Sequence, residues 1–228
     1  MEKESKYAVF RYQKCDEDLV EGLAEYLDAH AYVVFDFFEV DPPKDRKVAI
    51  DIIPTKREFN FVYIKDRNLP LDYHVPRWII GTSVFIENKI VYLSLHDYKS
   101  TSHPMREEPF EKAYEYYKKT ILHEFVHYVH GIYREKNNCE SPIRCFGEGI
   151  ACYLSGQKEG KNIKFDFTLE QLMSGEIRYD AYYLITKYLV ENYDKEFALK
   201  ILSDNQLSKD FLMTECYEKA NKYYLERT

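Results

Sequence analysis

Hydrophobic and polar positions alternate, or cluster in short runs, at several places in the first half of the chain. Alternation over residues 7–12 and the apolar run 47–53 each predict a β-strand. Between them, apolar residues recur at helical spacing from Asp16 to residue 38. Pro42 and Pro43 follow and cannot continue a helix. The pattern therefore predicts a strand, a long helix and a second strand.

A second pair of apolar runs, residues 82–86 and 90–95, flanks the polar turn 87–89 and predicts a hairpin. Residues 57–63 fit a short helix or a strand, and their pattern does not decide between the two. Residues 97–109 are polar and contain proline, so we expect a loop there.

The second half of the chain shows the helical period. Apolar positions from Phe110 to Tyr128 form one stripe, with Pro109 as the expected first helical residue and Gly131 as the expected end. A charged connection, 132–140, is expected next. A further helix is predicted over residues 142–155, and the tail from Tyr179 onward is helical in pattern.

Ser141 is the expected cap of the helix over 142–155, and Gly156 marks its end. Within this helix, two glycines flank Glu148. Each weakens a helix by about 1 kcal/mol, which indicates that a neighbouring helix packs closely there.

These elements give an α+β chain with a β-rich half, 1–108, and a helical half, 109–228, in a single domain of 228 residues. Hydrophobic residues make up 45% and charged residues 31%, as in ordinary globular proteins. The net charge of −7 and the lack of a basic patch argue against nucleic acid as a partner. No apolar run is long enough to span a membrane.

The five cysteines include no Cys-x-x-Cys pair, so we expect free thiols in a reducing cytoplasm. No feature of the sequence indicates the oligomeric state.

The chemistry is concentrated in His123-Glu124-Phe125-Val126-His127, a His-Glu-x-x-His pattern on a predicted helix. Residues four apart lie on one helical face, so His123 and His127 can direct two imidazole nitrogens at one zinc ion (Zn²⁺). Glu124 is placed to accept a proton from metal-activated water. With only 7 histidines in the chain, an accidental match is improbable.

A catalytic zinc site needs a third protein ligand and keeps one position for water. Glu148, in the middle of the next predicted helix, is the best candidate. His130 and Cys152 are its rivals. His130 follows the ligand face closely enough for a supporting role and is left out of the ligand set, and Cys152 is interpreted as a buried thiol.

The chain resembles the gluzincins, zinc metallopeptidases of the thermolysin and aminopeptidase type, and among them the small peptidase-MA-like proteins. Besides the His-Glu-x-x-His motif, the segment 146–151, Phe-Gly-Glu-Gly-Ile-Ala, is similar to the aromatic-x-x-Glu-Gly-x-Ala signature of that family, with the aromatic residue one place nearer the glutamate. The segments 75–81, 90–95 and 179–193 also look like the family, so the resemblance covers most of the chain.

The resemblance implies a zincin-like fold in which the metal site lies between a mixed sheet and the helical half. It implies that the strand 90–95 is the edge of the sheet, where a peptide adds as an extra strand. It also implies that Tyr179, or Tyr183 one turn later, donates a hydrogen bond to the oxyanion. One departure concerns the acidic residue that orients the first histidine in many gluzincins, because Cys152 stands at its position. Asp166 and Asp180 are possible replacements.

The sequence therefore predicts a zinc-dependent peptidase that hydrolyses a peptide or protein substrate, with Glu124 as general base. The alternative is a catalytically weak or inactive peptidase-fold protein that binds peptides or has a regulatory role. Cytosolic proteases of the His-Glu-x-x-His type that cleave a repressor usually come with a DNA-binding partner or domain, and this chain has no helix-turn-helix to spare. An intact Glu124 favours the enzyme, because a binding protein needs no general base.

Overall fold

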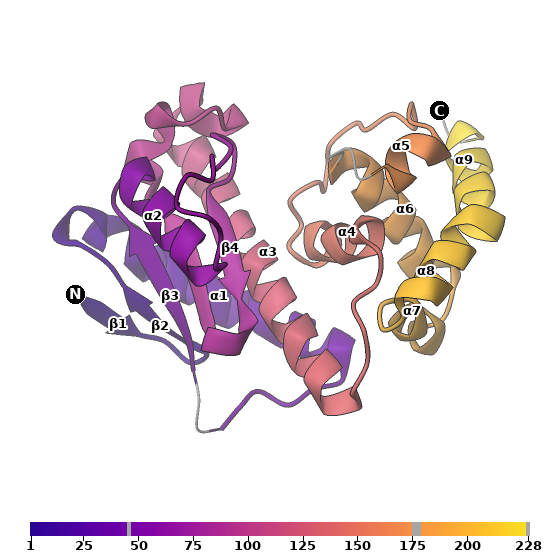
Figure 1. The fold of residues 1–228 in the computed structure, drawn as a ribbon, viewed down its shortest axis with the longest axis horizontal. Helices are drawn as coiled ribbons and strands as arrows, with labels where there is room; N and C mark the ends of the chain where they lie inside the picture. Colours follow the sequence, from indigo (N-terminus) through magenta and orange to yellow (C-terminus); the bar gives the residue numbers. More distant parts are fainter. Residues whose placement is uncertain (45–46, 175–178, 227–228) are drawn as a thin grey trace. The chain divides into compact units, whose positions relative to one another are not determined.

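The computed structural model describes residues 1–44, 47–174 and 179–226 (Figure 1). The chain divides into two compact units, Met1–Val129 and His130–Thr228. The division falls inside helix α3, Phe110–Asn137, which contributes residues to both units. The predicted α+β class is confirmed, with the strands in the first unit and mainly helices in the second. The organisation as a single catalytic domain stays a prediction.

In the described part of the first unit, five strands form one mixed sheet of order β1-β2-β3-β5-β4. β2 and β5 both run parallel to β3, whereas β1 and β4 are antiparallel to their neighbours. The strands are β1 (Glu2–Glu4), β2 (Ala8–Arg11), β3 (Val48–Ile53), β4 (Gly81–Val84) and β5 (Lys89–Leu93). Short 3-10 helices cover Lys14–Asp16, Phe85–Glu87, Leu95–Ser100 and Pro104–Glu107.

Helices cover both faces of this sheet. On one face, α1 (Glu17–Phe38) packs on α3 through an edge-to-face contact between Phe35 and Phe125, with ring centroids 5.6 Å apart. On the other face, α2 (Lys56–Asp66) lies against β3 and β5. This settles the undecided stretch 57–63 as helix, because the Thr55 hydroxyl caps it by accepting the N–H of Glu58 at 3.2 Å.

The expectation that residues 90–95 form the sheet edge is wrong. β5 lies between β3 and β4, and the edge strand next to it is β4, Gly81–Val84. The reason is the hairpin. After β3 the chain forms β4 at the outer edge of the sheet and then returns as β5, which pairs with both β4 and β3. The hairpin itself is confirmed.

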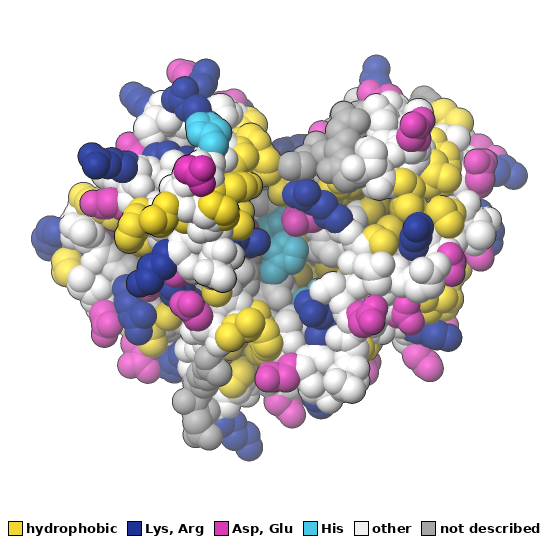
Figure 2. All heavy atoms as spheres, in the orientation of Figure 1, with side chains coloured by type: hydrophobic (Ala, Val, Ile, Leu, Met, Phe, Trp, Pro, Cys, Tyr) yellow, Lys and Arg dark blue, Asp and Glu magenta, His cyan; other side chains and the backbone are white. Residues whose placement is uncertain are grey.

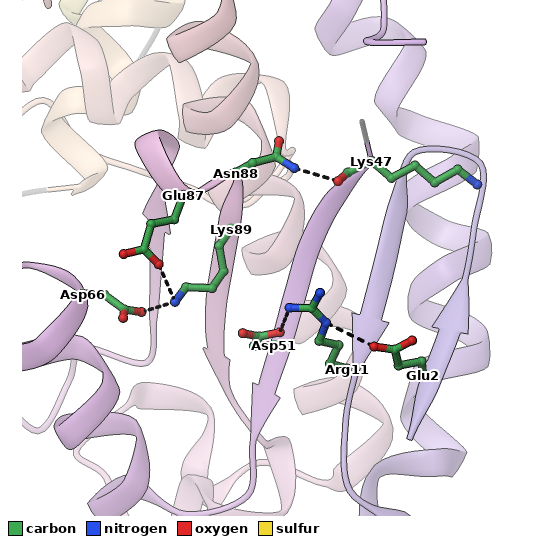
Figure 3. A network of polar contacts seen from close by, with 8 residues as sticks. All are labelled: Glu2, Arg11, Lys47, Asp51, Asp66, Glu87, Asn88 and Lys89. Atoms are coloured by element: carbon green, nitrogen blue, oxygen red, sulfur yellow. Dashed lines mark hydrogen bonds and ion pairs between the residues drawn. The ribbon is translucent and has the colours of Figure 1, made fainter. Parts of the chain in front are cut away.

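Charged side chains line the α2 face of the sheet (Figure 3). The Arg11 guanidinium lies 3.3 Å from Glu2 and 3.7 Å from Asp51, and it links three neighbouring strands. The Lys89 ammonium contacts Asp66 at 2.6 Å and joins β5 to α2. On the molecular face in Figure 2, basic and acidic side chains are interspersed on each unit.

In the second unit, α4 (Arg144–Leu154) packs against α6 (Tyr179–Asn192). Among the described helices, none is long and apolar enough to cross a membrane. The remaining helices are α5 (Leu169–Met173), α7 (Lys195–Ile201), α8 (Asn205–Phe211), a π-helical turn (Leu212–Cys216) and α9 (Tyr217–Leu225).

Two predicted helix boundaries are wrong. Gly131 does not end α3, which continues to Asn137 through the predicted charged connection. The left-handed residue that ends it is Asn138, at φ 49°, after which the N–H of Cys139 donates to the carbonyl of Arg134 at 3.1 Å. In the second case, α4 begins at Arg144, so neither the Ser141 cap nor a helical start at residue 142 is formed.

The late start of α4 has a tertiary cause. The Ser208 hydroxyl of α8 accepts the backbone N–H of Ile143 at 2.9 Å. Ile143 is held at ψ 155°, outside the helical range, and its carbonyl accepts the first bonds of the helix from Phe146 and Gly147.

Candidate metal centre

The two histidines of the motif lie on one face of α3. His123 is buried and His127 is half-buried. Their Nε2 atoms are 3.2 Å apart. In a tetrahedral site with zinc–nitrogen bonds of about 2.0–2.1 Å, two ligand nitrogens are about 3.3 Å apart. The pair is therefore spaced as two ligands of one ion would be.

Tyrosines of α3 fix the rotation of the helix against the rest of the first unit. The hydroxyl of Tyr117 donates to the carbonyl of Leu93 at the end of β5 at 3.0 Å. The hydroxyl of Tyr128 donates to the Asn88 side chain at 2.5 Å. Tyr117 precedes the histidine pair in the sequence and Tyr128 follows it, so α3 is attached to the first unit at both ends of this stretch. The imidazoles are therefore held on a defined face of α3.

Glu148 is half-buried in α4, and only one of its two flanking glycines is required by packing. A Cβ at Gly149 would lie 2.5 Å from the carbonyl oxygen of Tyr182 and 2.8 Å from the Cβ of Thr186, both on α6. A Cβ at Gly147 would meet only Pro142, at 3.8 Å. The expected close helix contact is thus confirmed for Gly149 and wrong for Gly147.

Within the described ranges, His123, His127 and Glu148 form a group that could hold a metal ion. One ligand atom from each lies within 4.8 Å of the others. Two imidazole nitrogens and one carboxylate oxygen match the donor set of a catalytic zinc site with a position left for water. The three residues therefore fit a metal ion, and the predicted third ligand joins the histidine pair.

The rivals for the third position have other partners. Nε2 of His130, which is buried, lies 2.9 Å from the carbonyl oxygen of Leu202. The thiol of Cys152 is fully buried and donates to the Gln157 side chain at 3.5 Å. This agrees with the interpretation of Cys152 as a buried thiol, and neither residue belongs to the metal-binding group.

Glu124 is half-buried and lies outside the group of three ligands, as a general base should. Its catalytic role stays a prediction. Sequence reasoning missed the buried Tyr92 of β5, whose ring meets that of Tyr117 on α3 edge to face with centroids 5.1 Å apart. No sequence motif identifies Tyr92, because its contact with α3 depends on how the sheet packs on that helix.

The two candidate oxyanion donors both lie on α6. Tyr179 is its first residue, and its ring is 6.2 Å from that of Tyr182. Tyr183 packs near Tyr153 of α4 with ring centroids 6.4 Å apart, and burial raises the pKa of its phenol. The Tyr183 phenol therefore keeps the proton that an oxyanion donor needs. The choice between Tyr179 and Tyr183 stays a prediction.

Of the two acids proposed to replace the family's orienting residue, Asp180 forms an ion pair with Lys158 at 2.5 Å. The Asp180 side chain is 57% exposed, so it is well solvated. The role of Asp166 or Asp180 beside the first histidine remains a prediction.

Comparison of the chain with models of known protein families, with curated proteins and with solved structures gives no match. The fold and the His123, His127 and Glu148 group are therefore the basis for any functional conclusion.

Proposed function

We propose that this protein is a zinc-dependent peptidase that resembles the gluzincins. The observation that carries the proposal is the metal-binding group, in which the Nε2 atoms of His123 and His127 are 3.2 Å apart and Glu148 supplies a carboxylate. A His-Glu-x-x-His helix with a third acidic ligand from the following helix is the ligand arrangement of that class of peptidase.

A zinc ion held by these ligands would supply a Lewis acid and lower the pKa of a water molecule. The chain's own contribution is made by Glu124, which follows His123 on α3. Its carboxylate accepts a proton from the attacking water and then returns the proton to the nitrogen of the leaving amine. Tyr179 or Tyr183 donates a hydrogen bond to the oxygen that becomes negative in the transition state.

We propose that the substrate is an extended peptide or protein segment that pairs with the sheet edge. That edge is β4, Gly81–Val84, whose described partner in the sheet is β5 on one side only. Main-chain hydrogen bonds would hold such a substrate, so affinity would depend weakly on sequence. The net charge of −7 and the five free cysteines support a cytoplasmic enzyme that does not act on nucleic acid or membranes.

One observation favours a second candidate, a weak or inactive peptidase-fold protein that binds peptides. Cys152 occupies the position of the orienting acid, and its thiol is bonded to Gln157. Loss of a partner that orients a metal ligand commonly lowers metal affinity or activity about 10–100-fold.

The test compares zinc-loaded wild type with Glu124→Gln on a library of unstructured peptides, with cleavage read by mass spectrometry. Glu124→Gln should keep its metal and lose hydrolysis by at least about 100-fold, the usual contribution of a positioned acid–base group. Glu115→Gln is the matched control, because Glu115 is an exposed residue on the same helix that pairs with Lys118. Cleavage by Glu124→Gln at the wild-type rate would refute the mechanism. Peptide binding without cleavage by the wild type would favour the binding module.

A further inference from the structure

The register of the hairpin determines which main-chain groups of the edge strand β4 are available to a substrate. The N–H of Leu93 donates to the carbonyl of Ile80, the residue before β4, at 2.7 Å. Hydrogen-bonded and non-hydrogen-bonded pairs alternate along an antiparallel ladder, so Gly81 and Ser83 form non-hydrogen-bonded pairs with β5. Their N–H and C=O groups therefore point away from β5, to the side on which no further described strand lies.

Helix α2 contacts this part of the chain from both of its ends. Lys56, the first residue of α2, donates from its ammonium to the carbonyl of Ile79, two residues before β4. Arg67, which follows the last residue of α2, donates from Nε to the hydroxyl of Thr82 at 3.0 Å. Both contacts are buried, since Lys56 is 8% and Thr82 2% exposed. Two cations of one helix thus hold the edge strand, one just before its start and one within it.

Each of the two cations is itself fixed in place. Nζ of Lys56 lies 4.6 Å from the ring centroid of Phe59, and Cζ of Arg67 lies 5.0 Å from that of Tyr63. Both rings belong to α2, so each cation lies over a ring of its own helix. Burial lowers the pKa of Lys56 to about 8, so at pH 7 most of the amine still carries its proton. Its bond to the carbonyl is therefore charge-assisted.

We propose that Lys56 and Arg67 are positioning residues for the substrate, which hold β4 so that the outward main-chain groups of its residues stay aligned with an extended peptide. The proposal rests on the function proposed above, in which the substrate pairs with this edge. A strand that already has its paired conformation need not be ordered when the peptide binds, and this raises affinity. The two cations therefore act on substrate binding and leave the chemical step unchanged.

The first arm of the test needs neither metal nor substrate. Hydrogen exchange of the metal-free protein, followed by mass spectrometry, is measured for peptides that cover residues 79–84. Lys56→Met and Arg67→Met should each raise the exchange rate there at least about 10-fold, because local opening is easier without one charge-assisted hydrogen bond. Lys118→Met is the matched control. Lys118 lies over the Tyr114 ring at 5.1 Å but pairs with the exposed Glu115 on its own helix.

Two results of this arm would overturn the proposal. One is exchange over residues 79–84 at the wild-type rate in both Lys56→Met and Arg67→Met. The other is an exchange rate that rises equally in β4 and in the remaining strands of the sheet, because it would show a general loss of stability.

The second arm uses the zinc-loaded enzyme and the peptide that it cleaves fastest. Lys56→Met and Arg67→Met should raise KM about 10-fold while kcat stays within about twofold, the pattern of lost uniform binding. Inhibition by acetohydroxamate, a small zinc ligand without a chain to pair with β4, should be the same as in wild type. A fall in kcat at unchanged KM, or equally weakened inhibition by acetohydroxamate, would show that the metal site itself is disturbed and would overturn the proposal.

A third variant, Ser83→Pro, tests whether the substrate uses the edge at all. Proline removes the N–H of Ser83, which points to the free side, and edge strands tolerate proline there. This substitution should raise KM about 3–10-fold, the effect of one main-chain hydrogen bond. An unchanged KM would overturn the proposal even if zinc-dependent cleavage persists. If the wild type cleaves nothing, the proposed function fails, and the exchange over residues 79–84 still decides whether Lys56 and Arg67 hold the strand.

Discussion

Replacing either glycine beside Glu148 by alanine tests how tightly α4 is packed. At Gly149, the added methyl would lie 2.5 Å from the Tyr182 carbonyl oxygen and 2.8 Å from the Cβ of Thr186. The first of these atoms is backbone and cannot rotate away, so α4 and α6 must separate. Overpacking of this kind costs about 1–3 kcal/mol, and a contact with backbone belongs near the upper end.

Alanine also favours a helix over glycine by about 1 kcal/mol, which offsets part of the clash. The net expectation for Gly149→Ala is a loss of about 2 kcal/mol in the free energy of unfolding. Gly147→Ala has the same propensity gain and space for its methyl, whose nearest neighbour is Pro142 at 3.8 Å. It should leave the stability unchanged or raise it by up to about 1 kcal/mol.

Urea unfolding of the two metal-free variants, followed by circular dichroism, measures this difference. The expected gap of about 2–3 kcal/mol corresponds to Tm values that differ by about 4–12 °C for a chain of this size. Gly149→Ala should also bind zinc more weakly, because the shift of α4 displaces Glu148. If Gly149→Ala were as stable as Gly147→Ala, the close contact between α4 and α6 would be wrong.

Two other predictions concern titration and catalysis. Burial lowers the pKa of Lys56 to about 8, against a smaller opposite effect of Asp97, while the unfolded chain has the usual value of about 10.4. Between these two pKa values the unfolded state binds more protons than the folded state, so wild type should gain stability as pH rises from about 8 to 10. Lys56→Met should lack this gain. Urea unfolding of both proteins at each pH measures the difference. For the oxyanion donor, Tyr179→Phe should lower kcat about 100-fold with little change in KM. If Tyr183→Phe lowers kcat instead, the donor lies one turn later on α6. If neither substitution lowers kcat, both tyrosines are excluded as the oxyanion donor.

The sequence predicts the elements whose signal is local. Strands β2, β3 and β5 and helix α1 are found because burial of one face imposes a period of two or 3.6 on neighbouring residues. The His123 and His127 pair is predictable for the same reason, since four residues make one helical turn.

Features set by contacts between distant segments could not be predicted. The order of β5 and β4 depends on which of the two strands pairs with β3, and the start of α4 depends on Ser208, far along the chain. Gly131 misled the prediction because a buried glycine inside a helix has the same local pattern as one at its end. The contact of Tyr92 with Tyr117 likewise exists only once the sheet packs on α3.

Glu148 is an intermediate case. Its glycine-flanked position singles it out in the sequence, yet nothing local places its carboxylate beside two imidazoles of another helix. That grouping follows from the fold, in which one ligand atom of Glu148, His123 and His127 lies within 4.8 Å of the others.

The metal content of the purified protein tests the central claim most directly. Wild type, His127→Ala and His74→Ala are expressed in zinc-supplemented medium, desalted and analysed for metals by mass spectrometry. His74 is an exposed histidine outside the metal-binding group, so its variant controls for adventitious binding. We predict one zinc per chain in wild type and His74→Ala and a loss of nearly all zinc in His127→Ala. Wild type without metal, or His127→Ala with a full zinc ion, would contradict the account.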